Sequence, residues 1–385
     1  MRSGFCDFEV LDFSYFDYAA TTFMPKNVIA ARNYYENNIC ISASRGKSSL
    51  SQIADEELRR SRSEICNFFS KNKEYNLIFY RGATYALNEI ARSITEYLNA
   101  MDIILIGPYE HHSNYLPWRE IAKEKGAIVF EMPLLDDGSI NIEYLHSIRN
   151  QIKVISFSSV SNTNGFKINL TNLMDVVTDD IIVIVDDSQR CAHDEIEDNN
   201  RIDCHVLNSH KMYGPKGIAG ALISNKMLNI MKPCVYGGGM IERIGFPNVW
   251  KEGISAFEAG TIDVSGIVGR REACKYIENF GYSNVLDMER KWHEKTWKLL
   301  SDNKNIQIVS CKDTTSLLSF YHKSIHAHDL DDKFSNEGII LRTGHICSQN
   351  SIVKFDMKPI IRVSFGISTD ENDIENLVRA LEVVL

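Results

Sequence analysis

The segment IIVIVDDSQ, residues 181–189, joins five consecutive aliphatic side chains to two carboxylates, a hydroxyl and an amide. A short, uninterrupted apolar run rich in β-branched residues is typical of a strand buried on both faces of a parallel sheet. Ligands bind just beyond the carboxyl ends of such strands. Asp186 stands at that end, where a carboxylate is costly to bury unless a cation pairs with it. The segment therefore predicts an α/β fold with a charged site at one edge of its sheet.

Similar apolar runs occur on both sides of this segment, and we expect further strands at residues 76–80, 102–106, 127–132, 154–160, 204–207 and 218–223. Helix-compatible stretches separate several of them, which predicts a mainly parallel sheet covered on both faces. Chemically rich loops follow five of the strands, with the sequences RGATYALN, GPYEHHSN, SNTNG, DDSQ and NSHKMYG. Ordinary turn chemistry is the alternative for any one of them, but together they indicate a site.

The pattern changes after about residue 262, where expected strands at 315–321 and 338–341 and a closing helix from about Asp370 predict a smaller α+β domain. Ser368 and Glu371 have the spacing of a capping box for that helix. We therefore expect a large domain over residues 17–262 and a small C-terminal domain over residues 263–385, with residues 1–16 packed on the small domain.

The overall composition excludes several classes of function. A net charge of -9 argues against a nucleic-acid partner, which needs a basic surface. No apolar run is long enough for a membrane span, and the first residues lack the apolar core of a signal peptide, so we expect a cytoplasmic protein. The nine cysteines are scattered without a C-x-x-C pair, so we expect no metal site.

The segment NSHKMYGPKG, residues 208–217, places Lys211 just after a predicted strand. A lysine there can form a Schiff base with a carbonyl cofactor, although a single loop lysine is more often simply solvated. Asp186 favours the first interpretation, because its carboxylate would pair with the protonated pyridine nitrogen of pyridoxal 5'-phosphate. A helix N-cap is the alternative role for this aspartate.

At this point the chain resembles a known family, the class V aminotransferase-like enzymes of pyridoxal-phosphate fold type I. Within that family it is most similar to the group II, SUF-type cysteine desulfurases and selenocysteine lyases. The resemblance covers nearly the whole chain and is carried, in order, by YFDYAATTFMP, RGATYALN, EHHSNYLPW, SNTNG, VDDSQ, SHKMYGPKG, YGGGMI, FEAGT, RTGHICSQ and IIRVS.

The resemblance implies roles for residues that would contact the cofactor. Lys211 resembles the Schiff-base lysine, Asp186 the partner of the pyridine nitrogen, and Gln189 a donor to the ring hydroxyl. His111 resembles the imidazole that stacks on the ring. The expected phosphate site and its neighbours comprise Ala83, Thr84, Asn208 and His210, with Thr261 reaching the phosphate of a neighbouring subunit. A homodimer is therefore implied.

The resemblance also implies the substrate site and the reaction. Arg362 resembles the clamp for the substrate carboxylate, with Asn162 as its helper, and Arg342 is assigned to the same site. Cys347 matches the nucleophilic cysteine. L-cysteine would be converted to L-alanine, with the sulfur carried on Cys347 as a persulfide for a SufU-like or SufE-like acceptor protein.

The chain departs from the family pattern at several positions. Asn208 replaces a serine, Ser209 a glycine, Ile346 the second histidine of R-x-G-H-H-C, and Ser48 a histidine. The alternatives that stay open are a selenocysteine lyase, another class V reaction without a persulfide, and a specialised or degenerate paralogue. His328 aligns with a histidine of SufU-partnered relatives, but an exposed histidine at a helix start is the preferred interpretation.

Overall fold

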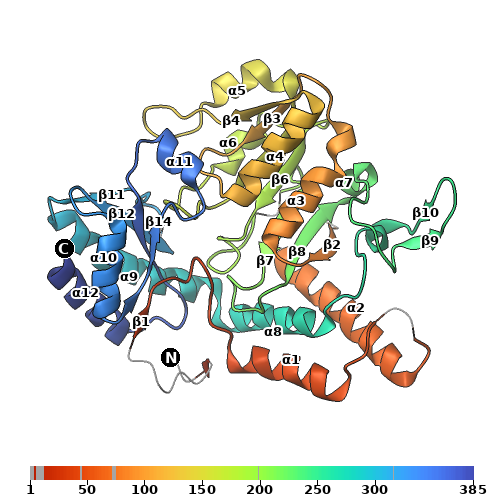
Figure 1. Cartoon of the computed structure of the whole chain (residues 1–385), viewed down its shortest axis with the longest axis horizontal. Helices are drawn as coiled ribbons and strands as arrows, with labels where there is room; N and C mark the ends of the chain where they lie inside the picture. The colour runs from red at the N-terminus through yellow and green to blue at the C-terminus, as the bar shows by residue number, and fades with distance from the viewer. Residues whose placement is uncertain (1–3, 6–12, 44–45, 72–74, 198, 315) are drawn as a thin grey trace.

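A computed structural model describes residues 4–5, 13–43, 46–71, 75–197, 199–314 and 316–385. Among them, seven strands form the central sheet (Figure 1). In spatial order these strands are β2 (Tyr75–Tyr80), β8 (Ala219–Ser224), β7 (Cys204–Asn208), β6 (Ile182–Asp186), β5 (Ile152–Ser158), β3 (Ile103–Ile106) and β4 (Ile128–Glu131). Strand β8 is antiparallel to its neighbours β2 and β7, and the other pairings are parallel. The predicted α/β architecture and these strands are confirmed, with bounds shifted by at most two residues.

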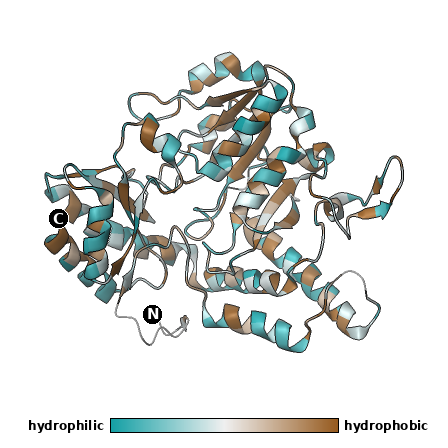
Figure 2. Cartoon of the chain, in the orientation of Figure 1, coloured by the Kyte–Doolittle hydropathy of each residue, from teal (hydrophilic) through white to brown (hydrophobic). Residues whose placement is uncertain are grey.

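Helices cover both faces of this sheet because alternate strand residues point in opposite directions. Ile182 and Ile184 pack into one hydrophobic cluster, and Val183 and Val185 into another. One face carries α3 (Ala83–Ser93), α4 (His112–Lys125) and α7 (Asn225–Ile230). The other carries α2 (Ser49–Phe69), α5 (Ile142–Ile148), α6 (Leu170–Met174) and α8 (Val264–Phe280), with α1 (Lys26–Asn38) packed outside α8. Figure 2 shows the resulting pattern: the strands are mostly hydrophobic, and the helices that cover them have one hydrophobic side.

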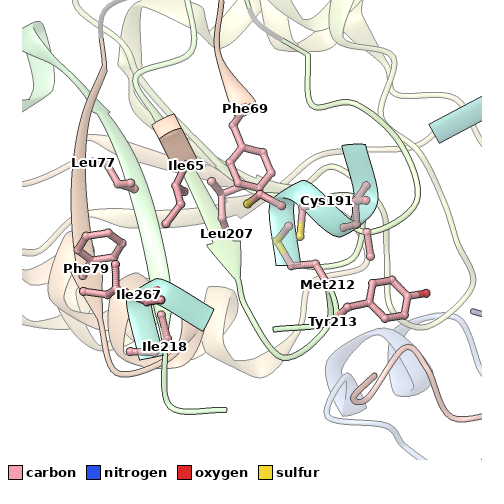
Figure 3. Packing of buried hydrophobic residues seen from close by; sticks show 14 of the residues in the cluster. Ile65, Phe69, Leu77, Phe79, Cys191, Leu207, Met212, Tyr213, Ile218 and Ile267 are labelled. Carbon is pink, nitrogen blue, oxygen red and sulfur yellow. The ribbon is translucent and has the colours of Figure 1, made fainter. Parts of the chain in front are cut away.

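The core between β2, β7 and the helices α2 and α8 also anchors the loop that carries Lys211. Figure 3 shows Phe69, Leu77 and Leu207 in one hydrophobic cluster with Met212 and Tyr213, the two residues that follow Lys211. Met212 and Tyr213 are fully buried, and the Tyr213 hydroxyl accepts a hydrogen bond of 2.8 Å from the Ile367 amide. The residues directly after Lys211 are thus fixed by packing.

A second, antiparallel sheet forms the core of the C-terminal part. Its strands in order are β11 (Ile306–Ile308), β12 (Leu317–His322), β15 (Ile360–Ser364) and β14 (Arg342–Gly344). It packs with α9 (Tyr282–Asp302), α10 (Ala327–Asn336) and α12 (Glu371–Val384). The expected strand at 315–321 corresponds to β12, although residue 315 lies outside the described residues. The expected strand at 338–341 is instead the short β13 (Ile339–Ile340), which pairs in parallel with β1 (Ser14–Tyr15).

Short elements complete the described chain. They are the hairpin strands β9 (Ile241–Arg243) and β10 (Val249–Trp250), helix α11 (Gln349–Lys354), and the 3₁₀ turns η2 (Thr95–Tyr97), η3 (Arg149–Gln151) and η4 (Gly253–Ala256). Within the described residues, no helix combines the length and apolar character needed to cross a membrane.

The boundary between a large and a small domain, expected between residues 262 and 263, stays a prediction. Helix α8, which this division assigns to the small domain, packs in the same cluster as Leu77 and Leu207 of the large sheet. Of the predicted N-terminal segment 1–16, residues 1–3 and 6–12 lie outside the described residues. Phe5 packs on Tyr213, and Phe16 packs in the core of the C-terminal sheet.

The capping box of α12 differs from the expected one. Asp370, not Ser368, is the N-cap, and the Asp370 carboxylate accepts a hydrogen bond of 3.2 Å from the Asp373 amide. The Asp373 carboxylate in turn accepts one from the Asp370 amide. Ser368 is buried and bonded to the hydroxyl of Tyr18 instead, so it starts no helix.

We expect Asp370→Ala to lower the free energy of unfolding by about 1 kcal/mol, because it leaves helix amides without an acceptor. Urea denaturation of the two proteins measures this difference. Glu371→Gln is the matched control, since Glu371 contacts only exposed lysines in the described chain. A loss for Asp370→Ala no larger than that for Glu371→Gln would contradict the assignment of Asp370 as the cap.

Candidate active site

A cavity of about 300 Å³ lies where the carboxyl ends of the parallel strands meet the C-terminal sheet. It is lined by all of the predicted site residues except Thr261, namely Ala83, Thr84, His111, Asn162, Asp186, Gln189, Asn208, His210, Lys211, Arg342, Cys347 and Arg362. Side chains far apart in the sequence therefore share one site, as the strand-end argument predicts. Thr261 lines a neighbouring cavity with Lys251 and Glu258.

Asp186 and Lys211 face this cavity from the ends of neighbouring strands. Asp186 is the last residue of β6, and its carboxylate accepts a hydrogen bond of 3.0 Å from the Ser188 amide. Burial raises the pKa of Asp186, although the nearby Lys211 ammonium opposes this shift. Burial lowers the pKa of Lys211, and the charge of Asp186 opposes that shift. The cavity thus holds a mutually stabilising carboxylate and amine.

His111 is held as a neutral ring at the start of α4. Its Nδ1 accepts a hydrogen bond of 3.1 Å from the Ser113 amide, so the imidazole acts as the N-cap. Burial, together with the positive charge of Lys211, lowers the pKa of His111 to about 3. An uncharged, fixed ring of this kind suits contact with an aromatic cofactor better than proton transfer.

The start of α3 lines the same cavity as Lys211 and could hold an anionic group. Gly82, at φ 140°, turns the chain into the helix, and no side chain caps the first amides, which follow at Ala83 and Thr84. Exposed amides at a helix N-terminus bind phosphate groups. His210 lies on the same cavity, with its Nδ1 3.2 Å from the Thr21 hydroxyl.

Arg342 and Arg362 are direct neighbours on the antiparallel strands β14 and β15. Asp17 lies between their guanidinium groups and neutralises part of their repulsion. Its Oδ2 accepts from Arg342 Nη2 at 2.6 Å, and its Oδ1 accepts from Arg362 Nη2 at 3.1 Å. Sequence reasoning missed Asp17, although it stands inside the quoted segment YFDYAATTFMP.

Cys347 is exposed at the cavity, on a turn between β14 and α11. Ile346 and Cys347 both have left-handed backbone angles, with φ 43° and 58°. Their carbonyl oxygens accept hydrogen bonds of 2.8 Å from Asn162 Nδ2 and from the His112 amide. The turn is therefore fastened to the loops after β3 and β5.

Several lining residues have no counterpart among the predicted ones; they are Ala19, Ala20, Ser113, Ser158, Val160, Ser188 and Ile346. Among the predicted residues, Gln189 uses its amide nitrogen to bond the Ala19 carbonyl at 2.8 Å, so its role toward a ring hydroxyl stays a prediction. Ser48, one of the departures from the family pattern, caps α2 by accepting from the Ser51 amide.

Glu110 is a buried acid next to the site that sequence reasoning also missed. Its carboxylate accepts hydrogen bonds from the Ser158 amide at 2.7 Å and from Asn114 Nδ2 at 2.6 Å. Burial raises the pKa of Glu110 to about 7 even though these bonds oppose the shift. The signal in the sequence was its place in EHHSN, directly before the predicted His111.

This shift predicts a pH dependence of stability in the cofactor-free protein. Because the folded pKa lies above the unfolded one, the folded state binds more protons between about pH 4.5 and 7, and stability falls by up to about 3 kcal/mol across that window as the pH rises. Glu110→Gln should flatten the dependence of the free energy of unfolding on pH in this window, as measured by urea denaturation at several pH values. Glu337 is exposed, so Glu337→Gln should leave that dependence unchanged. An unchanged slope in Glu110→Gln would contradict the prediction.

The residues of the cavity fit pyridoxal phosphate. Asp186 offers a carboxylate for a protonated ring nitrogen, Lys211 an amine, and the first amides of α3 a phosphate site. Asn208 Oδ1 and Arg362 Nε are buried without a hydrogen-bond partner among the described residues, as expected for groups that a bound molecule satisfies. The described His, Cys, Asp and Glu side chains form no cluster of three or more that could hold a metal ion.

A sheet covered on both faces, with this cavity at its carboxyl edge and a smaller C-terminal sheet beside it, is the architecture of fold type I. The model of the family "Aminotransferase class-V" matches residues 14–377. The chain belongs to this family, whose members depend on pyridoxal phosphate. The resemblance inferred from the sequence is thereby confirmed.

Individual relatives have more specific names. A protein named cysteine desulfurase from Wigglesworthia glossinidia brevipalpis is 30% identical over 375 residues, covering 95% of this chain and 91% of that protein. A probable cysteine desulfurase from Halalkalibacterium halodurans is 31% identical, covering 96% and 92% of the two chains. The apo structure of a cysteine desulfurase from Thermococcus onnurineus NA1 is similar with a TM-score of 0.92 and 26% identity, covering 100% of this chain and 97% of that one.

Proposed function

We propose that this chain is a pyridoxal-phosphate-dependent cysteine desulfurase that moves the sulfur of L-cysteine to Cys347. The observation that carries the proposal is that Cys347 lines the same cavity as Lys211, Asp186 and Arg362. Relatives that are named cysteine desulfurase and align with nearly the whole chain support it.

Lys211 is suited to act as the amine of the reaction. Because burial lowers its pKa, a larger share of the side chain is uncharged than in a solvated lysine. An uncharged amine can attack a carbonyl carbon and can accept a proton from the substrate Cα. The cofactor, when bound, supplies a ring that stabilises negative charge at that carbon.

Arg362 is suited to bind the substrate carboxylate. Its guanidinium is almost completely buried, and Asp17 and the Asn162 carbonyl hold its two Nη atoms at 3.1 and 2.9 Å. Its Nε stays free among the described residues. A guanidinium fixed in this way presents its remaining N–H donors without losing side-chain entropy when the substrate binds.

Cys347 would take the sulfur directly from the substrate. Its thiolate attacks the sulfur of L-cysteine, so that a sulfur–sulfur bond forms and the bond from sulfur to Cβ breaks. The electron pair of the broken bond passes to the substrate carbons, which gain a proton and leave as L-alanine. L-cysteine and a thiol thus give L-alanine and a persulfide, and no outside oxidant is required.

One experiment tests the proposal and its alternatives together. The cofactor-loaded enzyme is incubated with L-cysteine, and alanine and protein persulfide are measured in the first turnover. We expect equal amounts of both. Alanine or another product without persulfide would indicate a different class V reaction, and no product would indicate a degenerate paralogue. A much higher kcat/KM for L-selenocysteine would indicate a lyase for that substrate.

The proposal includes a homodimer in which Thr261 contributes to the phosphate site of the neighbouring subunit. Two features support it: Thr261 lies outside its own chain's main cavity, and the nearby hairpin leaves Ile244 and Phe246 strongly exposed. Light scattering should give the mass of two chains. A sulfur-acceptor protein and a cytoplasmic location stay predictions.

A further inference from the structure

Ser188 lines the cavity and has a buried hydroxyl to which no role has been assigned. It is the second residue after Asp186, and only 5% of its surface is exposed. Its Oγ forms no hydrogen bond of normal geometry with any described residue. Because buried hydroxyls normally have a partner, this one indicates a contact that is completed when the site is filled.

The backbone of Ser188 is fixed against the Asp186 carboxylate. The Ser188 amide donates to Asp186 Oδ1 at 3.0 Å. The residue between them is fastened to the neighbouring strand, since the Asp187 amide donates to the Val206 carbonyl at 2.9 Å. Backbone contacts thus set the position of Ser188 beside Asp186, and a change of the Ser188 side chain leaves these contacts in place.

The Ser188 hydroxyl acts on the same carboxylate. Burial raises the pKa of Asp186, and the hydroxyl and the amide of Ser188 are the groups that oppose this rise most, ahead of the Lys211 ammonium. A hydrogen-bond donor stabilises the ionised form of a carboxylate. Ser188 therefore favours a charged Asp186 at the point where this carboxylate would pair with a protonated ring nitrogen.

Two acidic neighbours increase the need for donors at Asp186. The charge of Asp187 adds to the rise in the pKa of Asp186, and the Asp187 carboxylate itself lies 2.7 Å from His205 Nδ1 in a buried pair. Glu110 is the second neighbour, because burial and, to a smaller extent, the charge of Asp186 raise the pKa of Glu110 to about 7. Asp186 thus lies among like charges, which the donors of Ser188 offset.

We propose that Ser188 is a positioning residue whose hydroxyl donates to the Asp186 carboxylate in the cofactor-loaded enzyme. The hydroxyl keeps this carboxylate charged, so that the proton between Asp186 and the ring nitrogen of the cofactor stays on the nitrogen. This inference rests on the cofactor part of the proposed function and not on the transfer of sulfur to Cys347.

Ser188→Ala tests the inference, because alanine keeps the amide that bonds Asp186 and removes only the hydroxyl. The enzyme is loaded with pyridoxal phosphate that carries an NMR-active nitrogen isotope in its ring, and the nitrogen signal is recorded at neutral pH without substrate. In Ser188→Ala the ratio of nitrogen-bound to Asp186-bound proton should fall about tenfold, since a hydrogen bond to a charged group changes an equilibrium by a factor of that order. The signal should move toward that of unprotonated pyridine, and an unchanged signal would overturn the inference.

Kinetics give a second measurement, which shows whether Ser188 acts through Asp186. We expect kcat with L-cysteine to fall by about threefold to tenfold in Ser188→Ala, with KM within about twofold of the original value because Arg362 is untouched. In an Asp186→Asn background, the same change should alter kcat by less than about twofold, because the hydroxyl then has no charge to stabilise. Equal losses in the two backgrounds would overturn the inference, since Ser188 would then act on the substrate or the ring directly.

Ser159→Ala is the matched control. Ser159 is also a buried serine beside Asp186, but its Oγ contacts the backbone carbonyl of Asp186, at 3.5 Å. This variant should leave the nitrogen signal unchanged, and a shift as large as that of Ser188→Ala would contradict the proposal. If the original enzyme holds the cofactor but forms no persulfide, the proposed function fails, and the nitrogen signal still decides the role of Ser188. If the original enzyme holds no cofactor, both are wrong.

Discussion

Lys211→Ala should lower kcat with L-cysteine by a factor on the order of 10³ or more, because it removes both the amine that binds the cofactor and the base that takes the substrate proton. Borohydride reduction of the original enzyme should fix the cofactor to the protein, and the mass of the peptide containing Lys211 should rise accordingly. In Lys211→Ala this mass increase should be absent.

The control for this prediction lies in the same loop. Lys216 is exposed and lies outside the cavity lining, so Lys216→Ala should keep both the reducible cofactor and the activity. A Lys211→Ala protein that still gains the cofactor mass on reduction would show that another lysine forms the link. That result would remove the basis for the assignment of Asp186 as well.

The strands of the large sheet could be predicted because each is a continuous apolar run between polar loops. Strand β6, from Ile182, is buried on both faces, so its hydrophobic pattern alone predicts its position. The same logic places Asp186 at the strand end. The pattern also predicts that the loops after neighbouring strands meet, and this is why His111, Asp186 and Lys211 could be expected in one cavity.

The contacts between the two sheets could not be predicted in this way. Strands β13 and β14 have only two and three residues, which is too short for a recognisable alternation. The register of β14 on β15 decides that Arg342 faces Arg362, and the contact of both with Asp17 joins residues more than 300 positions apart. Such pairs follow from tertiary packing, which local sequence patterns do not encode.

The same limit applies to Asn162 and Glu110. The sequence identifies both as polar residues in chemically rich loops, but it does not show which groups their side chains contact. Asn162 was expected beside the substrate carboxylate, and its amide lies against the Cys347 turn. The Glu110 carboxylate is bonded by Ser158, the last residue of strand β5, and by Asn114 of helix α4.

Cys347→Ala should reduce persulfide formation from L-cysteine to background, a loss on the order of 10³-fold or more, while the absorbance of the bound cofactor is retained. The reason is that buried thiols such as those of Cys191 and Cys274 cannot replace the exposed Cys347. Burial raises the pKa of Cys191 and of Cys274 to about 12, so both stay protonated at neutral pH.

Cys40 provides the matched control for Cys347. Of the cysteines in the described part of the chain, only these two are exposed, and Cys40 follows the end of helix α1, away from the cavity lining. Cys40→Ala should therefore form persulfide at the original rate.

If Cys347→Ala also forms persulfide at the original rate, the sulfur is not carried on Cys347, and the desulfurase proposal in its present form is wrong. If alanine is still released but no persulfide forms, the cavity performs a carbon–sulfur cleavage that does not need the thiol. These outcomes differ because only the persulfide requires a nucleophilic sulfur within reach of the substrate, and Cys347 is the cysteine that lines this cavity.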